Sequence, residues 1–307
     1  MKKTFLLTGG AGFIGVNLSR FLVKKGYKVI VVDDLSAGYS FDRLPSEVIC
    51  HQVDIKNTEE VSKYFAGIDV VVHLAALPRV QFSIENPIAS HDTNVMGTLS
   101  VLEAVRHNRV GKLVFISSSA VYGDQEQMPL SLDLPAEPKS PYALHKYFGE
   151  RMMKLWSELY GINTVSLRLF NVYGPDMDPN GAYALVIGLF LRLLSEGKKL
   201  TITGDGNQTR DFIYVDDVAN AIMKAALSDK VNDGQILNVG FGKEISINKL
   251  AEIMMGDKSD NIEYVAPRIE PKRTCSDISE TVKILDWQPK ISLLEGVKIL
   301  KQKSGLG

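Results

Sequence analysis

The sequence predicts an α/β protein built on a doubly wound parallel sheet, with a smaller α/β lobe. Within residues 3–34, an apolar run, a glycine turn, a helical pattern and a second apolar run follow one another. More short apolar runs alternate with helical segments up to residue 169, and shorter elements with longer loops follow. We therefore expect a first domain over residues 1–170 and a lobe over residues 171–307, interleaved, with a nominal boundary.

The first turn has the composition of a dinucleotide site. In a strand, turn and helix unit, glycines permit a tight turn, the approach of a pyrophosphate to the backbone, and packing of the helix on the strand. The helix N-terminus then presents free N–H groups to the phosphates. The predicted fold is therefore of the Rossmann type. The residues expected at this turn are Gly9, Gly12, Phe13, Ile14 and Gly15.

Asp33 closes the second apolar run, about twenty residues after the glycines, as such sites require. A carboxylate there can accept hydrogen bonds from a ribose 2′-hydroxyl, and it would repel a 2′-phosphate. The predicted cofactor is therefore NAD rather than NADP.

The remaining elements follow in order along the chain. Apolar runs of four to seven residues predict buried strands, and apolar residues at helical spacing predict the helices between them. In the first domain we expect strands at 4–7, 29–32, 48–53, 69–73, 112–116 and 163–169, and helices at 58–65, 84–105 and 140–160. In the lobe we expect strands at 200–203, 236–239 and 262–265, and helices at 216–227, 247–255 and 279–285.

Composition excludes several classes of function. The net charge of −1 comes without a basic stripe, so neither a nucleic-acid binder nor a polybasic membrane anchor is expected. Cys50 and Cys275 lack metal-ligand spacing and are too few for a disulfide framework, so we expect no metal and a cytoplasmic location. Glycines interrupt the apolar start too early for a signal peptide, and we expect no membrane-spanning segment.

Candidate catalytic groups lie at the end of the fifth predicted strand and on the next helix. Tyr142 and Lys146 are one turn apart and share a face. A free tyrosine has a pKa near ~10, which a nearby ammonium and the positive nicotinamide of NAD would lower. Residues 117–119 are serines at the carboxyl end of a parallel strand, where ligands bind. His73 is interpreted as a strand-end histidine rather than a catalyst, because no carboxylate partner is near it in the sequence.

The glycine spacing, in the form TGGAGFIG, resembles the extended short-chain dehydrogenase/reductase family of nucleotide-sugar epimerases, dehydratases and decarboxylases. The resemblance covers essentially the whole chain and is nearest to UDP-hexose 4-epimerases. It implies that Tyr142 and Lys146 contact NAD as well as performing catalysis. It also implies further cofactor contacts from Asp54, Ile55, Leu74, Ala75, Ala76 and Asn94.

Within this family the residues after the catalytic Ser or Thr separate the reactions. Counting back three residues from Val121 gives Ser118 as the catalytic hydroxyl, and Ser119 and Ala120 stand where related dehydratases and decarboxylases carry acids. The resemblance therefore implies reversible hydride transfer at C4 of the sugar, with Tyr142 taking the 4-hydroxyl proton. Ser118 and Ser119 are also expected to contact the sugar. For Ser117, a contact with the sugar and a purely structural role explain the sequence equally well.

The resemblance also implies a site for a UDP-sugar in the lobe. Asn171, Arg210 and Arg268 match diphosphate-binding positions of the family. Counting back three residues from Asp277 gives Thr274, where a small residue admits N-acetyl sugars; if the frame slips by one residue, Cys275 takes its place. Residues 179–187 are similar to the branch that acts on UDP-N-acetylglucosamine and UDP-N-acetylgalactosamine.

We therefore predict a UDP-hexose 4-epimerase acting on the N-acetylhexosamine pair, with UDP-glucose and UDP-galactose as further substrates. Two alternatives stay open. A UDP-glucuronate 4-epimerase would need a cation near the C6 carboxylate, and a non-catalytic nucleotide-sugar or NAD(P) sensor would keep the fold without turnover. The family commonly forms homodimers, so we expect a four-helix interface from residues 84–105 and 142–160.

Overall fold

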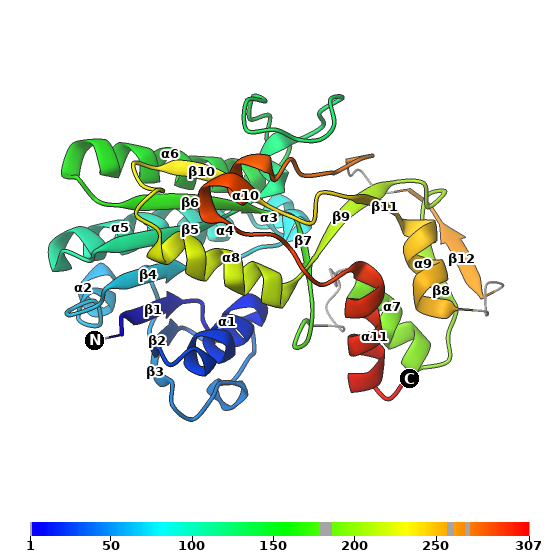
Figure 1. The fold of residues 1–307 in the computed structure, drawn as a ribbon, viewed down its shortest axis with the longest axis horizontal. Helices are drawn as coiled ribbons and strands as arrows, with labels where there is room; N and C mark the ends of the chain where they lie inside the picture. Colours follow the sequence, from blue (N-terminus) through cyan, green and yellow to red (C-terminus); the bar gives the residue numbers. More distant parts are fainter. Residues whose placement is uncertain (1, 179–185, 257–260, 268–270, 307) are drawn as a thin grey trace.

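The computed structural model describes residues 2–178, 186–256, 261–267 and 271–306 (Figure 1). Its centre is a seven-stranded sheet in the order β10-β6-β5-β4-β1-β2-β3, and every pairing in it is parallel. The doubly wound α/β prediction is therefore confirmed. The strands are β1 Thr4–Thr8, β2 Lys28–Asp33, β3 Ile49–Gln52, β4 Val70–His73, β5 Lys112–Ser118, β6 Thr164–Leu169 and β10 Gln235–Val239.

Both faces of the sheet are covered by helices, which explains why its strands are continuously apolar. Phe5 and Leu7 of β1 belong to one buried core, and Leu6 between them belongs to the other, because successive side chains point to opposite faces. The helices α1 Phe13–Lys24 and α8 Val215–Leu227 cover the first face. The second face is covered by α2 Thr58–Ser62, α5 Gly97–Asn108 and α6 Pro141–Tyr160 (Figure 1).

The single helix predicted over residues 84–105 is wrong. The chain instead forms α3 Val80–Glu85, α4 Pro87–His91, a π-helical turn at Asp92–Met96 (η2) and α5. Asn86 has φ −129° and ψ 60°, outside the helical region. A proline disfavours helical geometry in the residue before it, and Pro87 therefore separates α3 from α4.

The second lobe contains two small sheets flanked by helices. β9 Thr209–Tyr214 lies between β7 Asn171–Tyr173 and β11 Glu244–Ser246, and β8 Leu200–Thr203 pairs with β12 Ile262–Val265. The helices of this part are α7 Val186–Ser195, α9 Ile247–Met255 and α11 Leu293–Lys303 (Figure 1).

The chain returns to the first domain after entering the lobe. Strand β10 pairs with β6, α8 packs on α1, and α10 Ser279–Leu285 lies against β10. The chain therefore passes between the two parts more than once, and the division at residue 170 stays a prediction. Three-residue and four-residue 3-10 turns lie at Phe41–Arg43 (η1) and Ser119–Tyr122 (η3). Among the described residues, none of the helices combines the length and apolar character that a membrane span needs.

Candidate active site

The glycine turn after β1 is packed tightly at two of its three predicted positions. Gly9 has φ +69°, and a Cβ there would lie 2.5 Å from the Ala75 nitrogen. A Cβ on Gly15 would lie 2.5 Å from the Gly10 Cα, so the helix could not approach the turn with a larger residue. Gly10 was not predicted as a site residue, yet its Cβ would meet the Val31 side chain at 2.6 Å. These glycines hold α1 close to the sheet.

Gly12 has a different environment. It is the N-cap of α1 with φ −71°, and a Cβ there would lie 3.3 Å from the Gly9 carbonyl oxygen. A glycine has no side chain to cap the first N–H groups of the helix, which leaves them available to an anion. Phe13 and Ile14 follow and pack against the core. Gly12 is therefore the place where a phosphate can approach the backbone.

Asp33 stands beside this turn at the end of β2. Its Oδ2 accepts a hydrogen bond from the Ala11 amide at 3.0 Å, and its Oδ1 accepts one from the Leu35 amide at 2.9 Å. Burial raises the pKa of this carboxyl, and the two amide hydrogen bonds oppose that shift. A carboxylate has about four acceptor sites, so two amides leave capacity for a ribose hydroxyl.

The other predicted cofactor residues line the same edge of the sheet. The Leu74 amide donates to the Thr8 carbonyl at 3.0 Å, and Ala75 touches Gly9. The buried Ile55 packs against Gly97, where a Cβ would lie 2.6 Å from its Cδ1. The Asp54 carboxylate lies 3.5 Å from Lys56 Nζ. Ala76 completes the partly buried segment after β4.

Asn94 acts on this segment through the backbone. Its Oδ1 accepts from the Leu77 amide at 2.7 Å, and its Nδ2 donates to the Leu77 carbonyl at 3.1 Å and to Ser90 Oγ at 3.3 Å. The side chain is buried. A cofactor role for Asn94 stays a prediction, and these bonds give it an indirect form, in which Asn94 fixes the loop after β4.

His73 has the structural environment that the sequence favoured. Its Nδ1 is 2.7 Å from Thr8 Oγ1, and its Nε2 is 3.0 Å from Thr98 Oγ1. Burial, with a smaller contribution from the nearby Lys146 charge, lowers the pKa of His73 to about 3. Both ring nitrogens are bonded within the protein, and the ring is neutral at ordinary pH.

The three serines at the end of β5 differ in their surroundings. Ser117 is buried and donates to Glu150 Oε1 at 2.6 Å, which makes it a structural residue. Ser118 ends the strand, accepts from the Ala120 amide at 3.2 Å and hydrogen-bonds the Tyr142 hydroxyl. Ser119 is partly exposed and begins η3. The structure therefore brings Ser118 to Tyr142.

Helix α6 is fixed where it carries Tyr142. Ser140 is its N-cap and accepts from the Ala143 amide at 3.2 Å, and Pro141 occupies the first turn. The Tyr142 amide, one of the N–H groups that a helix leaves unpaired, donates to Ser83 Oγ of α3 at 3.0 Å. Two serines thus set the position of the tyrosine.

Lys146 lies one turn further along α6 and is buried. Its Nζ donates to the Ile116 carbonyl at 2.8 Å and lies 5.9 Å from the centroid of the Tyr142 ring. Burial lowers the pKa of Lys146 to about 8, and the Glu150 carboxylate opposes this. The ammonium therefore remains the main form at neutral pH.

One electrostatic expectation is wrong for the chain by itself. We expected the Lys146 ammonium to lower the pKa of Tyr142, but burial raises it, and the hydrogen bond from Ser118 is the opposing influence. The reason is that desolvation of the phenolate outweighs a cation whose own hydrogen bond goes to the Ile116 carbonyl.

On the lobe side, the predicted residues come from neighbouring strands. Asn171 begins β7 and is paired with Phe212 of β9. Arg210 of β9 is buried, and its Nη1 donates to the carbonyls of Thr209 at 2.7 Å and Pro271 at 2.9 Å. Arg268 and most of the segment 179–187 lie outside the described residues.

Thr274 is buried beside the same strand. Its amide donates to the Thr209 carbonyl at 3.2 Å, and its Oγ1 donates to that oxygen at 3.4 Å. Cys275 is partly exposed, and its carbonyl accepts from the Leu130 amide at 2.7 Å. Asp211, next to Arg210, is structural, because its carboxylate accepts from the Phe241, Gly242 and Ser276 amides.

Sequence reasoning missed a buried ion pair behind the serines. Glu150 and Arg168 form two hydrogen bonds of 2.8 Å, and their side chains are 0% and 5% exposed. The sequence could have indicated one of the two residues, because Glu150 is four residues after Lys146 and lies on the same helix face. Arg168 on β6 has no such local relation to either residue.

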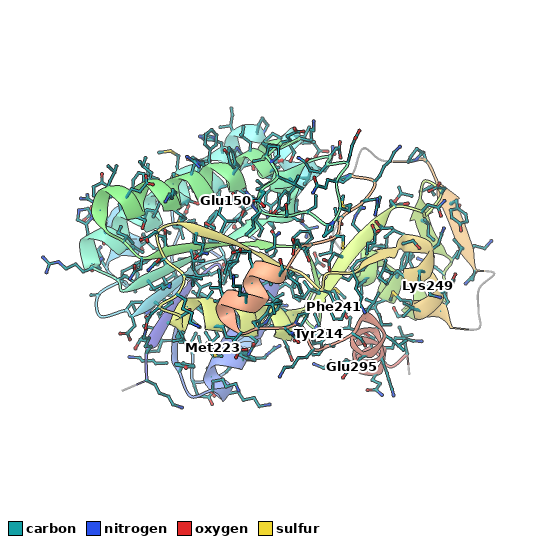
Figure 2. All side chains as sticks on the ribbon, turned by 45° about the horizontal axis from the view of Figure 1, so that its top comes forward. Glu150, Tyr214, Met223, Phe241, Lys249 and Glu295 are labelled. Atoms are coloured by element: carbon teal, nitrogen blue, oxygen red, sulfur yellow. The ribbon has the colours of Figure 1, made fainter. Side chains whose placement is uncertain are left out.

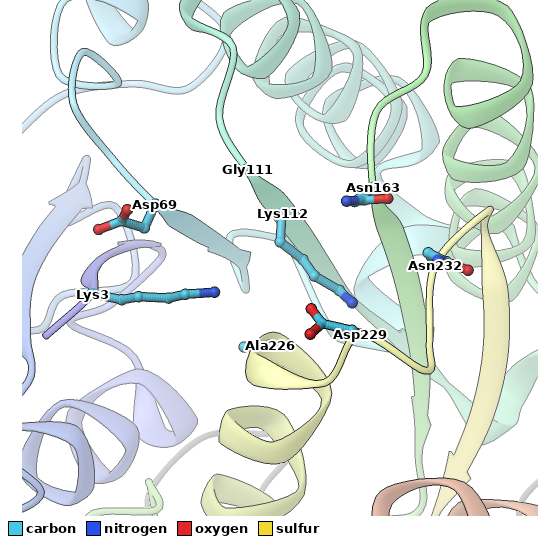
Figure 3. A pocket seen from close by; sticks show the side chains of 8 residues that line it. All are labelled: Lys3, Asp69, Gly111, Lys112, Asn163, Ala226, Asp229 and Asn232. Atoms are coloured by element: carbon cyan, nitrogen blue, oxygen red, sulfur yellow. The ribbon is translucent and has the colours of Figure 1, made fainter.

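A polar depression at the opposite edge of the sheet does not belong to this site (Figure 3). It lies at the amino ends of β1, β4 and β5, whereas ligands of parallel sheets bind at the carboxyl ends. Lys112, which lines it, donates to the carbonyls of Ser228 and Val231. The lysine therefore ties β5 to the loop before β10.

The chain's own residues fit NAD at the carboxyl edge. Gly12 leaves room for a phosphate at the start of α1, Asp33 retains acceptor capacity beside it, and the 74–76 segment lies against Gly9. Tyr142, Ser118 and Lys146 meet at the same edge, two strands away from β1 across β4. The arrangement can hold a dinucleotide and place a hydroxyl pair beside its reactive end.

Comparison with known proteins agrees with this geometry. The sequence profile of the NAD dependent epimerase/dehydratase family matches residues 5–240. A protein from Methanocaldococcus jannaschii is 42% identical over 299 residues, with 95% of each chain covered.

Solved structures are similar over the whole chain. A UDP-N-acetylglucosamine 4-epimerase from Methanobrevibacter ruminantium M1, in complex with UDP-N-acetylmuramic acid, is 35% identical with a TM-score of 0.91, covering 99% of this chain and 100% of that one. A UDP-glucuronic acid 4-epimerase from Bacillus cereus, in complex with UDP-glucuronic acid and NAD, is 34% identical with a TM-score of 0.89, covering 98% and 99%. The chain belongs to the NAD-dependent epimerase/dehydratase family, and its cofactor is NAD.

Proposed function

We propose that this protein is a UDP-hexose 4-epimerase that interconverts UDP-N-acetylglucosamine and UDP-N-acetylgalactosamine, and also UDP-glucose and UDP-galactose. The observation that carries the proposal is the meeting of Ser118, Tyr142 and Lys146 at one edge of the sheet. Ser119 and Ala120 follow Ser118, so the strand end supplies no acid for an elimination. Reversible oxidation at C4 is the reaction that these residues support.

In this reaction Tyr142 takes the proton of the sugar 4-hydroxyl and Ser118 holds the same oxygen by a hydrogen bond. NAD, held by the Gly12 turn and Asp33, would supply the acceptor and donor of the hydride at C4 of the sugar, and its positive charge would favour the tyrosine phenolate. The 4-keto sugar turns over in the site between the two transfers, so that the hydride would return to the opposite face of C4, and Tyr142 returns the proton to the C4 oxygen. Lys146 remains charged beside Tyr142, which opposes the cost of burying a phenolate.

The lobe supports a nucleoside diphosphate sugar. Arg210 supplies a permanent positive charge with a forked donor geometry suited to a diphosphate, and Asn171 starts the adjacent strand. Thr274 is small and buried next to Arg210's strand, which favours an N-acetyl group at C2. Arg268 is proposed as a second diphosphate contact on its sequence alone.

The test is proton NMR of purified protein with UDP-N-acetylglucosamine, UDP-glucose or UDP-glucuronate and no added NAD, following the anomeric and H4 signals. Conversion of UDP-N-acetylglucosamine to its C4 epimer is expected, and Tyr142→Phe should reduce it at least ~10²-fold because the general base is lost. Tyr147→Phe on the same helix is the control variant.

Each other outcome has a definite meaning. Conversion of UDP-glucose alone would refute the interpretation of Thr274. Conversion of UDP-glucuronate alone would favour the alternative that the Bacillus cereus relative exemplifies. A protein that retains NAD but converts none of the three, and whose function in cells survives Tyr142→Phe, would be a sensor of nucleotide sugars.

We also propose a cytoplasmic homodimer. Both cysteines are free thiols, as a reducing compartment would keep them. The helices α3, α4 and α6 expose a group of large apolar side chains that a second copy of the chain would cover: Val80, Ile84, Ile88, Leu144, Phe148, Leu155 and Leu159.

A further inference from the structure

A buried carboxylate lies directly behind the proposed catalytic residues. Glu150 is 1% exposed and lies on α6, one turn beyond Lys146. Its Oε1 accepts from Ser117 Oγ at 2.6 Å and from Arg168 Nε at 2.8 Å, and its Oε2 accepts from Arg168 Nη2 at 2.8 Å. Figure 2 shows the labelled residue between α6 and the sheet.

Glu150 and Lys146 together tie α6 to the last residues of β5. Lys146 donates to the Ile116 carbonyl at 2.8 Å, and Glu150 accepts from Ser117. These two strand residues immediately precede Ser118. The helix that carries Tyr142 is therefore joined to the strand that carries Ser118 by two adjacent polar contacts, which fixes one hydroxyl relative to the other.

Further polar contacts connect this ion pair to the loop segments that precede α10. The Arg168 guanidinium lies 4.5 Å from the centroid of the Tyr122 ring, and the Tyr122 hydroxyl donates to Asn238 Oδ1 at 2.8 Å. Asn238 Nδ2 donates to the carbonyls of Leu130 at 2.8 Å and Asp277 at 3.1 Å. A continuous buried network thus runs from α6 to the segment that carries Thr274.

Stability by itself is a poor reason for this arrangement. A buried ion pair often contributes no more to folding than well-packed apolar side chains of the same volume, because both charges lose their hydration. The hydrogen bond to Ser117 and the position one turn from Lys146 give the carboxylate an effect that apolar residues could not supply.

We propose that Glu150 is a positioning residue of the epimerase reaction, which holds the Ser118 strand end against α6 and places a negative charge one helical turn from Lys146. The proposal rests on the proposed function. The carboxylate is expected to have two effects, one on the position of the strand end and one on the charge of Lys146. They can be separated, because Ser117 takes part in the positional effect and not in the charge effect.

The charges around Lys146 support the second effect. His73 of β4 and His145 of α6 are near enough to feel the Lys146 charge, and their pKa values are lowered to about 3 and about 4, chiefly by burial, so both are neutral and neither adds a positive charge. Tyr142 is protonated at rest, since burial raises its pKa. Glu150 is the anionic group of this set and raises the pKa of Lys146. Arg168 of β6 pairs with Glu150, and Tyr122 of η3 lies against the Arg168 guanidinium.

The experiment compares Glu150→Gln with Ser117→Ala. Glutamine keeps the shape and removes the charge, so the pKa of Lys146 should fall and the alkaline limb of kcat should move at least one pH unit lower. At pH 8 we expect this charge effect to lower kcat fivefold or more, with the KM for the UDP-sugar within twofold. Ser117→Ala should lower kcat about threefold at every pH, without moving the limb.

Because Glu150→Gln leaves the Arg168 charge unpaired, the double variant Glu150→Gln/Arg168→Gln provides a second route if the single variant does not fold. A wild-type pH profile in either variant, or a loss of kcat that is uniform over pH, would overturn the proposal.

A measurement that needs no enzyme turnover can test the role of Glu150 independently of the proposed epimerase activity. In protein with 13C-labelled lysine, the Lys146 Cε signal is assigned with Lys146→Met and followed through a pH titration. Its midpoint should fall in Glu150→Gln and stay in Ser117→Ala. An unchanged midpoint refutes the charge effect even in an active enzyme, whereas wild-type protein without turnover refutes the function and leaves this titration valid.

Discussion

His73 shows at the scale of one residue how burial decides between a catalytic and a structural histidine. Its two ring nitrogens are bonded to the hydroxyls of Thr8 and Thr98, and its pKa is lowered to about 3. The group is therefore neutral in the folded protein at pH values where the unfolded chain already binds a proton, near ~6.5.

The stability of the protein should depend on this difference. A depressed histidine pKa contributes stability above the unfolded pKa, and that stability is lost as the pH falls toward the folded pKa, at about 1.4 kcal/mol per pH unit. We expect His73→Gln to flatten the pH dependence of the unfolding free energy between pH 6.5 and 4 by about this slope. Urea unfolding across that range measures it.

Thr98→Val is the control for this prediction. It removes a hydrogen-bond partner of His73 but keeps the titrating ring, so it should destabilise the protein and preserve the slope. The explanation fails if His73→Gln has the wild-type slope.

Thr274 is the residue that should set substrate choice. Thr274→Tyr would place a ring in a buried site beside the Thr209 backbone. We expect kcat/KM for UDP-N-acetylglucosamine to fall at least ~10²-fold, with that for UDP-glucose within about fivefold, because only the N-acetyl sugar needs the space. Steady-state kinetics with both substrates measures the ratio.

Thr274→Ser, which stays small, should keep the wild-type ratio. Cys275→Tyr tests the alternative frame. If that variant loses the N-acetyl substrate and Thr274→Tyr does not, the selective position is one residue further along the chain.

At the scale of an element, two glycines of the same turn are expected to have different roles. Gly9 is needed for packing of the turn, and Gly12 is needed for access of a phosphate to the backbone. Gly9→Ala places a Cβ 2.5 Å from the Ala75 nitrogen at φ +69°, so we expect a loss of about 2–4 kcal/mol of unfolding free energy. Gly12→Ala meets the Gly9 oxygen at 3.3 Å without φ strain, so stability should change by less than about 1 kcal/mol. Its methyl group should nevertheless reduce retained NAD at least tenfold.

Urea unfolding and the NAD content of the purified protein measure the two effects. Gly38→Ala controls for backbone strain, because Gly38 has φ +77° and no heavy atom within 4 Å of a Cβ. Wild-type NAD content in Gly12→Ala would show that the phosphates do not approach the backbone there.

The segment 80–108 shows the limit of periodicity within an element. Its apolar spacing continues through Pro87, so we predicted one helix over 84–105, but the chain forms two short helices, a π turn and α5. The π turn contains Asn94, whose amide bonds to Leu77 across the sheet edge. The position of the break could have been predicted from Pro87 in the sequence. The hydrogen bonds between Asn94 and Leu77 could not, because they depend on how the two segments meet in the fold.

At the scale of the whole molecule, the exposed apolar face of α3, α4 and α6 predicts the assembly. Ile88 is 85% exposed and Phe148 is 43% exposed. We expect a dimer by light scattering at micromolar concentration, and a monomer for the double variant Ile88→Asp/Phe148→Asp, because two carboxylates would have to be buried in the interface.

Leu294 is the matched control, since it is 67% exposed but lies on α11 in the lobe. Leu294→Asp should remain a dimer. A wild-type protein that is monomeric at micromolar concentration would remove the assignment of this face.

The sequence by itself was enough to predict the strand, glycine turn and helix of the dinucleotide site and the pair of candidate catalytic residues on one helix. Glycine spacing, the carboxylate at Asp33 and the four-residue step from Tyr142 to Lys146 are local, and local geometry follows from dihedral preference and helical period. The end of a buried strand pointed to three serines, and the resemblance to the family selected Ser118 among them. The predicted lobe elements also match α8, α9, α10, β8, β10 and β12 closely.

Only the tertiary structure decided which distant groups meet. The pairing of β10 with β6, the bond of Ser117 to Glu150 and the ion pair with Arg168 join residues between 18 and about 70 positions apart. Such contacts arise when burial forces polar groups to find partners, and they leave no periodic trace in the chain. For the same reason the pKa of Tyr142 could not be read from the nearness of Lys146, because its sign depends on how much water the fold removes.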